Sequence, residues 1–248
     1  MTEIEIHRYK KVQLQDATIL NGFPTLSVAG TIAANYLIGS LNMDQVGAFD
    51  SVDFPPVSMV YDSKPKFPAR IYVGGNNSLA AILSEFTPPP VLTRPIGKTI
   101  FLWAEETGCT RIITPEVVGT LDEGAEEDVR IYGVGSTERA RKELARIGVK
   151  QLKRGMITGV PGVLINEGKL KNFDVISLLA EVKPGFSDSR AAAKLLETIS
   201  LLLPDIKIDV EPLYEEAEKI EKFIKMLMDK VKISVKGGRQ REPLDMYR

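Results

Sequence analysis

The sequence predicts an α/β fold in which a mostly parallel sheet is covered on both faces by helices. Short runs rich in β-branched and apolar residues alternate with segments that carry helix caps and stops. The length of 248 residues suits one such domain with an appendix. Near residue 211 the alternation gives way to a seven-residue repeat. We therefore expect a core over residues 1–210, a helix over 211–232 and a flexible tail over 233–248.

Charge and cysteine content narrow the range of partners. The formal net charge is -1, which favours neither nucleic acid nor an anionic membrane surface as a partner. Cys109 is the only cysteine, so no intramolecular disulfide can form, as is usual in a reducing cytoplasm. The N-terminal segment has no apolar signal core, and we therefore expect a cytoplasmic protein.

The N-terminal segment contains His7, the single histidine, among alternating apolar and polar residues. This pattern predicts an edge strand with His7 facing solvent rather than a catalytic histidine. Cys109 has no second histidine to pair with, so a partly buried thiol is favoured over a nucleophile. One histidine and one cysteine cannot form a zinc site, and we expect neither a metal nor a cofactor.

Residues 17–43 contain no charged residue, but Gly22 and Pro24 interrupt the run. The interruption predicts a strand over 17–20, a tight turn and a helix over about 25–41. We expect this helix to be buried in the domain rather than to span a membrane. The turn lacks both GxGxxG spacing and a GK[ST] ending, so it does not match a nucleotide-binding fingerprint.

The middle of the chain supplies the remaining elements. Buried strands are predicted by runs of β-branched and apolar residues over 69–73, 111–114, 129–134 and 175–179. Helices are predicted by capping and terminating residues: 78–86 after Asn77, a helix started by Thr93 and Pro95 and stopped at Gly108, 139–147 before Gly148, and 190–203 before Pro204.

One predicted loop is a candidate anion site. Gly74, Gly75, Asn76 and Asn77 lie between a predicted strand and a predicted helix, where free amides can bind a phosphate or a carboxylate. A tight turn with an asparagine cap is the favoured alternative. Other acidic residues are expected to face water, namely Glu105, Glu106, Asp122, Glu123, Glu126, Glu127 and Asp128.

The C-terminal segment predicts an amphipathic helix with a heptad seam. The seam residues recur at steps of four and three positions and are Leu213, Ala217, Ile220, Ile224, Leu227 and Val231. Tyr214, Phe223 and Met228 flank them. The apolar stripe is therefore wide enough to pack on its own domain or on other copies of the chain.

The tail ends in Met246, Tyr247 and Arg248. A hydrophobic residue, a tyrosine and a terminal residue resemble the HbYX motif of proteasome activators and related assembly factors. The resemblance implies that Tyr247 and the terminal carboxylate enter pockets between neighbouring subunits of the α-ring of the 20S proteasome. A carboxyl terminus can be captured by a lysine or by backbone amides, while the apolar and aromatic side chains supply buried area.

The turn after the first core strand extends this resemblance. Four residues fit the turn typical of the proteasome assembly chaperone family, which includes archaeal homologues: Gly22, Phe23, Pro24 and Gly30. Ser27 stands where a glycine is common in that family. Residues 155–168 and 181–202 are also similar to the family. The resemblance implies a three-layer α/β sandwich related in architecture to purine nucleoside phosphorylases, without implying their chemistry.

The resemblance and the tail together predict a non-enzymatic, ATP-independent partner of the 20S proteasome, either an assembly chaperone or an activator. We expect a homo-oligomer, with a related assembly factor as a further candidate partner. The alternative is a small-molecule enzyme or binding protein, for a nucleoside or phosphate ester, that uses the loop Gly74 to Asn77. The presence of a single histidine and the lack of a convergent acid and base pair count against it. A third possibility is an oligomeric scaffold in which Tyr247 has no role.

Overall fold

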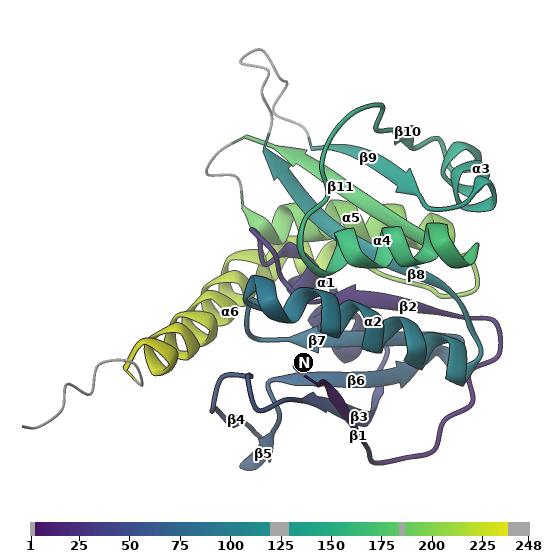
Figure 1. Cartoon of the computed structure of the whole chain (residues 1–248). Coiled ribbons are helices and arrows are strands. Elements are labelled where there is room, and N and C mark those ends of the chain that lie inside the picture. The colour runs from purple at the N-terminus through teal and green to yellow at the C-terminus, as the bar shows by residue number, and fades with distance from the viewer. Residues whose placement is uncertain (1–2, 120–128, 184–186, 238–248) are drawn as a thin grey trace, which may run out of the picture.

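The computed structural model describes residues 3–119, 129–183 and 187–237, which form three layers with a large sheet between two layers of helices (Figure 1). Within these residues the sheet has nine strands in the order β1-β3-β6-β7-β2-β8-β11-β9-β10. The strands are β1 (Glu5–Arg8), β2 (Ala17–Gly22), β3 (Asp44–Asp50), β6 (Ala69–Gly74), β7 (Leu79–Ser84), β8 (Cys109–Gly119), β9 (Arg130–Gly135), β10 (Lys150–Gln151) and β11 (Asp174–Val182). A separate hairpin consists of β4 (Met59–Tyr61) and β5 (Lys64–Lys66).

Helices cover both faces of the sheet. α2 (Pro90–Thr107) and α4 (Gly159–Lys171) lie on one face, in front in Figure 1. α1 (Ala29–Ser40), α3 (Glu138–Arg146) and α5 (Asp188–Leu202) lie on the other. α6 (Glu211–Gly237) follows α5, contacts α5 and α1, and runs outward from the body (Figure 1). The predicted layered α/β class is confirmed.

The sheet is mixed rather than mostly parallel. The strands β7, β2, β8 and β11 form a parallel centre. On one flank β6, β3 and β1 pair antiparallel, and on the other β9 pairs antiparallel with β11. Helical crossovers connect the central parallel strands, whereas a short turn joins β6 to β7, which allows only antiparallel pairing.

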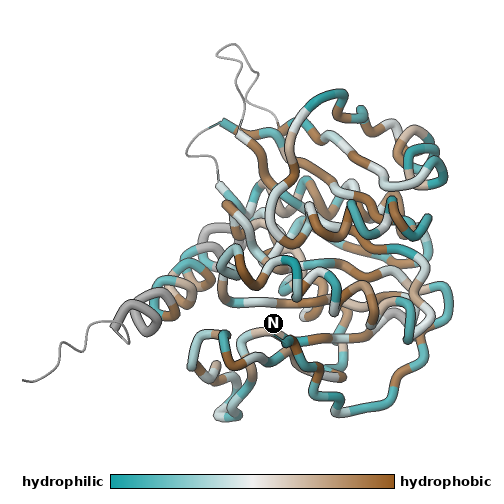
Figure 2. The backbone as a smooth tube through the Cα atoms, viewed as in Figure 1, coloured by the Kyte–Doolittle hydropathy of each residue, from teal (hydrophilic) through white to brown (hydrophobic). Residues whose placement is uncertain are grey.

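Two hydrophobic cores lie on the two faces of the sheet. Ile19, Ile112 and Val175 are register partners across the three central strands, and all three belong to the core beneath α2 and α4. The next residue of each strand belongs to the opposite core, because successive strand side chains point to opposite faces. Strands buried on both faces therefore carry continuous apolar runs, which Figure 2 shows as brown segments in the middle of the molecule.

One predicted helix is wrong. Residues 78–86 contain strand β7, whose six residues are all buried, rather than a helix capped by Asn77. A short apolar run between turn residues is compatible with both structures, and periodicity alone cannot separate them. Asn76 and Asn77 adopt left-handed backbone angles, with φ of 55° and 67°, and so reverse the chain from β6 into β7. The sequence patterns also missed β3.

The other predicted elements are present, with shifted ends. α2 begins at Pro90, before the predicted start at Thr93, and ends at Gly108, whose φ of 83° is the left-handed conformation that a helix C-terminus favours. Side chains cap two helices: Thr137 accepts from the amide of Ala140, and Ser187 accepts from that of Arg190. In the described ranges, no helical segment combines the length and low charge that a bilayer crossing requires.

Candidate functional site

The C-terminal helix α6 turns part of the predicted seam toward the core of its own chain. Four apolar side chains are buried and a fifth is half-buried: Leu213, Ile224, Met228 and Val231, with Leu227. Met228, expected only to flank the seam, is thus part of the buried face. The side chains of Ala217 and Ile220 lie outside the described part. The helix also continues to Gly237, five residues beyond the predicted end at 232.

The outward face of α6 keeps apolar side chains in contact with solvent. Phe223 is 46% exposed and Met226 is 44% exposed. Lys225 pairs with Asp188 at the start of α5, with 3.3 Å between Nζ and Oδ2, and so connects the helix to the body. Met246, Tyr247 and Arg248 lie outside the described residues, as does the acidic run from Asp122 to Asp128.

The turn between β2 and α1 consists of residues that permit close packing. A Cβ on Gly22 would lie 2.4 Å from the carbonyl oxygen of Ile82, and one on Gly30 would lie 2.8 Å from that of Pro115. Phe23 is buried and makes edge contacts with Phe49 and Phe86. These residues position the turn against the ends of the central strands.

Replacement of Gly22 by alanine is expected to destabilise the protein by about 2 to 3 kcal/mol, because the added methyl group must displace backbone of β7. The matched control is Gly39→Ala in the same helix-turn unit, where an added Cβ meets nothing within 4 Å. That control should be neutral or stabilising by about 0.5 to 1 kcal/mol. Urea denaturation measures both changes, and equal stability of the two variants would contradict the packing role of Gly22.

Beside this turn, a group of polar side chains meets at the carboxyl ends of the central strands. The hydroxyl of Thr25 donates to Glu116 of β8. The hydroxyl of Ser27 donates to Asp188 of α5 with an oxygen to oxygen distance of 2.6 Å, and it accepts from the amide of Ala29. Glu116 is only 8% exposed, and burial raises the pKa of its carboxyl group to about 8, although the hydrogen bond from Thr25 lowers it.

Sequence patterns missed Glu116, Thr25 and Asp188 as a group. The available signal is the position of Glu116, which interrupts the apolar strand β8 between a proline and two valines. An isolated carboxyl group in a strand buried on both faces requires a special environment. The partners of Glu116 cannot be read from the chain, because Thr25 is 91 positions away from it.

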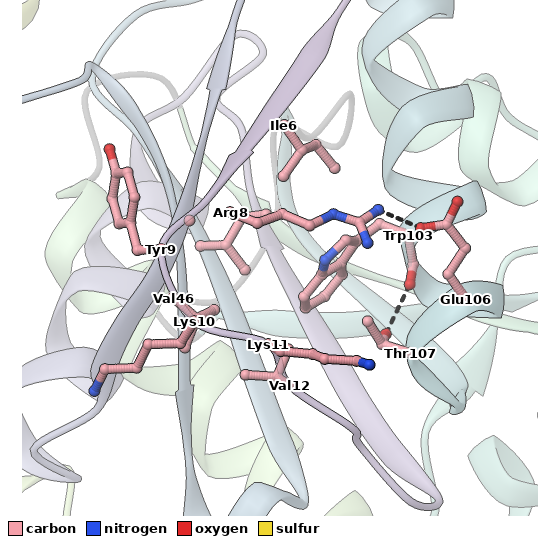
Figure 3. Close-up of a pocket in the computed structure, with 12 residues that line it drawn as sticks. Ile6, Arg8, Tyr9, Lys10, Lys11, Val12, Val46, Trp103, Glu106 and Thr107 are labelled. Carbon is pink, nitrogen blue, oxygen red and sulfur yellow. Dashed lines mark hydrogen bonds and ion pairs between the residues drawn. The ribbon is translucent and has the colours of Figure 1, made fainter.

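A pocket lies between edge strand β1 and helix α2 (Figure 3). Its wall includes the indole of Trp103 and the basic side chains Arg8, Lys10 and Lys11. Arg8 pairs with Glu106 of α2. Lys10 pairs with Asp44, with 2.9 Å between Nζ and Oδ2. Glu105 and Glu106 are exposed, as predicted, and each also forms an ion pair, since Glu106 pairs with Arg8 and Glu105 pairs with Lys171.

The loop from Gly74 to Asn77 does not support the predicted anion site. It is a turn between two antiparallel strands that contains a three-residue 3-10 helix, Gly75–Asn77, and no α-helix begins there. The amides and dipole of an α-helix N-terminus, on which the anion-binding hypothesis depended, are therefore absent from this loop. The alternative of an enzyme that uses this loop loses its structural basis.

Two further residues considered from the sequence, His7 and Cys109, are placed by the structure. His7 lies on edge strand β1, as predicted, half-exposed and 3.2 Å from a carboxylate oxygen of Asp50. Cys109 is buried, and burial raises the pKa of its thiol to about 11, so it is a poor nucleophile near neutral pH. Within the described residues, no group of three or more histidine, cysteine, aspartate or glutamate side chains is arranged to hold a metal ion.

The fold and turn define a class of three-layer α/β proteins with an outward C-terminal helix. A family model, the PAC2 family, matches residues 19–228, and the chain belongs to this family. PbaA of Pyrococcus furiosus, described as an archaeal homolog of proteasome-assembly chaperone, is 30% identical, with 93% of this chain and 99% of that chain covered and a TM-score of 0.82. An uncharacterized protein of Methanocaldococcus jannaschii is 24% identical, with 94% of each chain covered.

A further solved structure shares the fold. PbaB of Pyrococcus furiosus, described as an archaeal proteasome activator, has a TM-score of 0.74 and 22% identity, with 92% of this chain and 99% of that chain covered. The similarity to the proteasome assembly chaperone family, first indicated by Gly22, Phe23, Pro24 and Gly30, is therefore confirmed at the level of family and fold.

Proposed function

We propose that this chain is a non-enzymatic proteasome-binding factor that docks Met246, Tyr247 and Arg248 into pockets of the α-ring of the 20S proteasome. The observation that carries the proposal is membership of the PAC2 family, together with 30% identity to a homolog of proteasome-assembly chaperone over almost the whole chain. Met246, Tyr247 and Arg248 are a hydrophobic residue, a tyrosine and a basic residue, an order that suits a pocket of the kind that recognises a carboxyl terminus.

The position of α6 supports delivery of the tail. The helix leaves the body, is anchored on one side by Ile224 and Met228, and ends at Gly237 (Figure 1). Eleven residues follow it in the sequence, from 238 to 248. A flexible chain of that length has an end-to-end distance of about 17 to 20 Å, so the last three residues would reach a surface beyond the helix end.

Several tails would bind better than one. A single three-residue anchor is weak, but copies on one oligomer raise the effective concentration of the next anchor and increase affinity by about a hundredfold to ten-thousandfold. The exposed Phe223 and Met226 on α6 are suited to contacts between copies of the chain. Self-association is thus part of the proposed mechanism.

Removal of Met246 to Arg248 is expected to weaken binding to purified 20S proteasome at least a hundredfold, because every copy in an oligomer loses its anchor. Surface plasmon resonance with immobilised proteasome measures the affinity, and light scattering checks that the oligomer mass is unchanged. Tyr247→Ala should have a similar effect. The matched control is Leu244→Ala, an apolar truncation in the same tail outside the last three residues, which should bind like the unmodified protein.

Two outcomes would reject the tail mechanism. One is equal binding by the full-length and shortened proteins, and the other is no binding by either. The first would place the contact on the folded body, and the second would remove the 20S proteasome as a direct partner.

A further inference from the structure

A pocket of about 400 Å³ lies at the carboxyl ends of the parallel strands β2, β8 and β11. Its wall comes from segments that are far apart in the chain: the turn after β2, the end of β8, the start of α4, the end of β11 and the start of α5. In sheets of this kind, the crevice outside the carboxyl ends of the strands is where ligands bind. None of the residues that line the pocket belongs to the tail, and an occupant would be additional to the proteasome contact proposed above.

Glu116 gives this pocket an unusual polar group. One carboxyl oxygen accepts the hydrogen bond from Thr25, and no other described residue hydrogen-bonds to the carboxyl group. The residue is more than nine-tenths buried and lines the pocket. Since the pKa of Glu116 is about 8, the group is mainly neutral at neutral pH and has a hydroxyl hydrogen to donate.

The start of α4 adds a donor on another side of the pocket. Thr158 precedes the helix, lines the pocket, and makes no capping bond with its side chain. Its hydroxyl is therefore the donor that this segment presents to the pocket. Gly159 has a φ of 68°, and a Cβ there would lie 2.8 Å from Thr25, so glycine lets the helix start approach the turn closely.

The charged groups around the pocket leave the site suited to an anion. Asp188 is engaged by the hydroxyl of Ser27 and by Lys225 of α6. Lys183, at the end of β11, also lines the pocket. With Glu116 neutral, the groups left to meet a ligand include its carboxyl hydroxyl, the hydroxyl of Thr158 and the ammonium group of Lys183, all of which can donate.

We propose that this pocket binds the carboxylate group of a small organic acid, whose oxygens accept hydrogen bonds from Glu116 and from the hydroxyl of Thr158. The apolar part of the acid would lie along the rim, where Leu26 is 93% exposed and Met156 is 81% exposed. Two large apolar side chains left in water at the rim of a pocket with a few polar groups are typical of a site for a ligand with a polar head and an apolar body.

The test is titration of the full-length protein with hexanoate, followed by isothermal calorimetry. Hexanoate remains ionised between about pH 6.5 and pH 9.5, so the protein alone changes its protonation. Binding should weaken roughly thirtyfold over this range, because Glu116, with a pKa of about 8, loses the hydrogen that it donates. Hexanoate should also bind more tightly than acetate, by roughly fourfold for each buried methylene group.

Glu116→Gln separates this site from an unspecific effect of pH. The glutamine amide keeps a donor and an acceptor without titrating, so hexanoate binding should persist and lose its pH dependence. The matched control is Glu138→Gln on α3, an exposed carboxylate paired with Lys142, which should retain the thirtyfold change.

Three outcomes would overturn the proposal. They are no hexanoate binding at either pH, whether or not sulfate binds, binding that tightens as pH rises, and pH dependence that persists unchanged in Glu116→Gln. The proposed tail contact is tested separately, by binding to the 20S proteasome, so failure of one proposal leaves the other testable.

Discussion

Replacement of Arg70 by methionine is expected to lower the free energy of unfolding by about 3 to 5 kcal/mol, because it leaves a buried carboxylate without its charge partner. Arg70 lies on β6 and is 1% exposed, and its guanidinium pairs with Glu85, which is 2% exposed. Arg70 also donates to the carbonyl of Phe67 over 2.7 Å and to the hydroxyl of Tyr72 over 2.9 Å. Several hydrogen bonds are therefore lost together.

The loss should depend on pH. Burial raises the pKa of Glu85, and Arg70 and then Tyr61 lower it through their interactions with the carboxylate. Without Arg70 the folded-state pKa of Glu85 rises further, so the unfolded state loses its proton first as pH increases. Arg70→Met should therefore be less destabilising near pH 4 than near pH 8, as measured by urea denaturation at both values.

A double variant identifies the cause. Adding Glu85→Gln to Arg70→Met removes the unpaired charge and should recover part of the stability at pH 8. The single variant Glu85→Gln serves as the reference for the double-variant cycle. Tyr61 of the hairpin β4 and β5 donates a hydrogen bond to Glu85, so the buried pair also connects the hairpin to the sheet. A decrease in the free energy of unfolding of less than 1 kcal/mol in Arg70→Met at pH 8 would show that the pair contributes little to stability.

Glu116→Gln is expected to stabilise the folded protein at high pH by about 3 to 5 kcal/mol. The folded-state pKa of Glu116 is about 8, above the ordinary value of 4.5. A group whose pKa is raised by folding contributes its full stability below its unfolded pKa and loses it as pH rises through the folded pKa. The charged form is therefore costly in the native protein above pH 8, and glutamine has no such form.

Thermal unfolding across pH measures this effect. The melting temperatures of Glu116→Gln and the unmodified protein should agree near pH 4, separate between about pH 4.5 and pH 8, and differ by roughly 10 °C above pH 8. Glutamine can still accept the hydrogen bond from Thr25, so the packing is preserved. The exposed substitution Glu138→Gln should give no such separation, and a constant difference at all pH values would exclude protonation of Glu116 as its cause.

Local patterns in the sequence were sufficient for much of the fold. The central strands β2, β8 and β11 consist of apolar runs long enough to be recognised alone. Gly108 ends α2 where the sequence predicts it, since only glycine readily adopts the left-handed conformation there. The heptad repeat predicted α6, because helical side-chain spacing is a property of the chain itself.

The predictions failed where a local pattern was compatible with two structures. Residues 79–84 form a strand because they pair with β6 and β2 on either side, and that pairing is invisible in the run itself. The proportion of parallel pairs was overestimated for the same reason. At Gly74 to Asn77 the sequence offered an anion site as a candidate and favoured a tight turn before a helix; the structure has a tight turn there, but it leads into a strand.

The family, the layered α/β class and the C-terminal helix could be assigned from the chain alone, because they depend on spacing between neighbouring residues and on the turn from Gly22 to Gly30. The buried face of α6, and the contacts of Arg70 with Glu85 and of Thr25 with Glu116, required the folded structure. Burial and hydrogen bonding between residues of different elements are set by strand order. Strand order brings together the ends of segments that are a hundred residues or so apart.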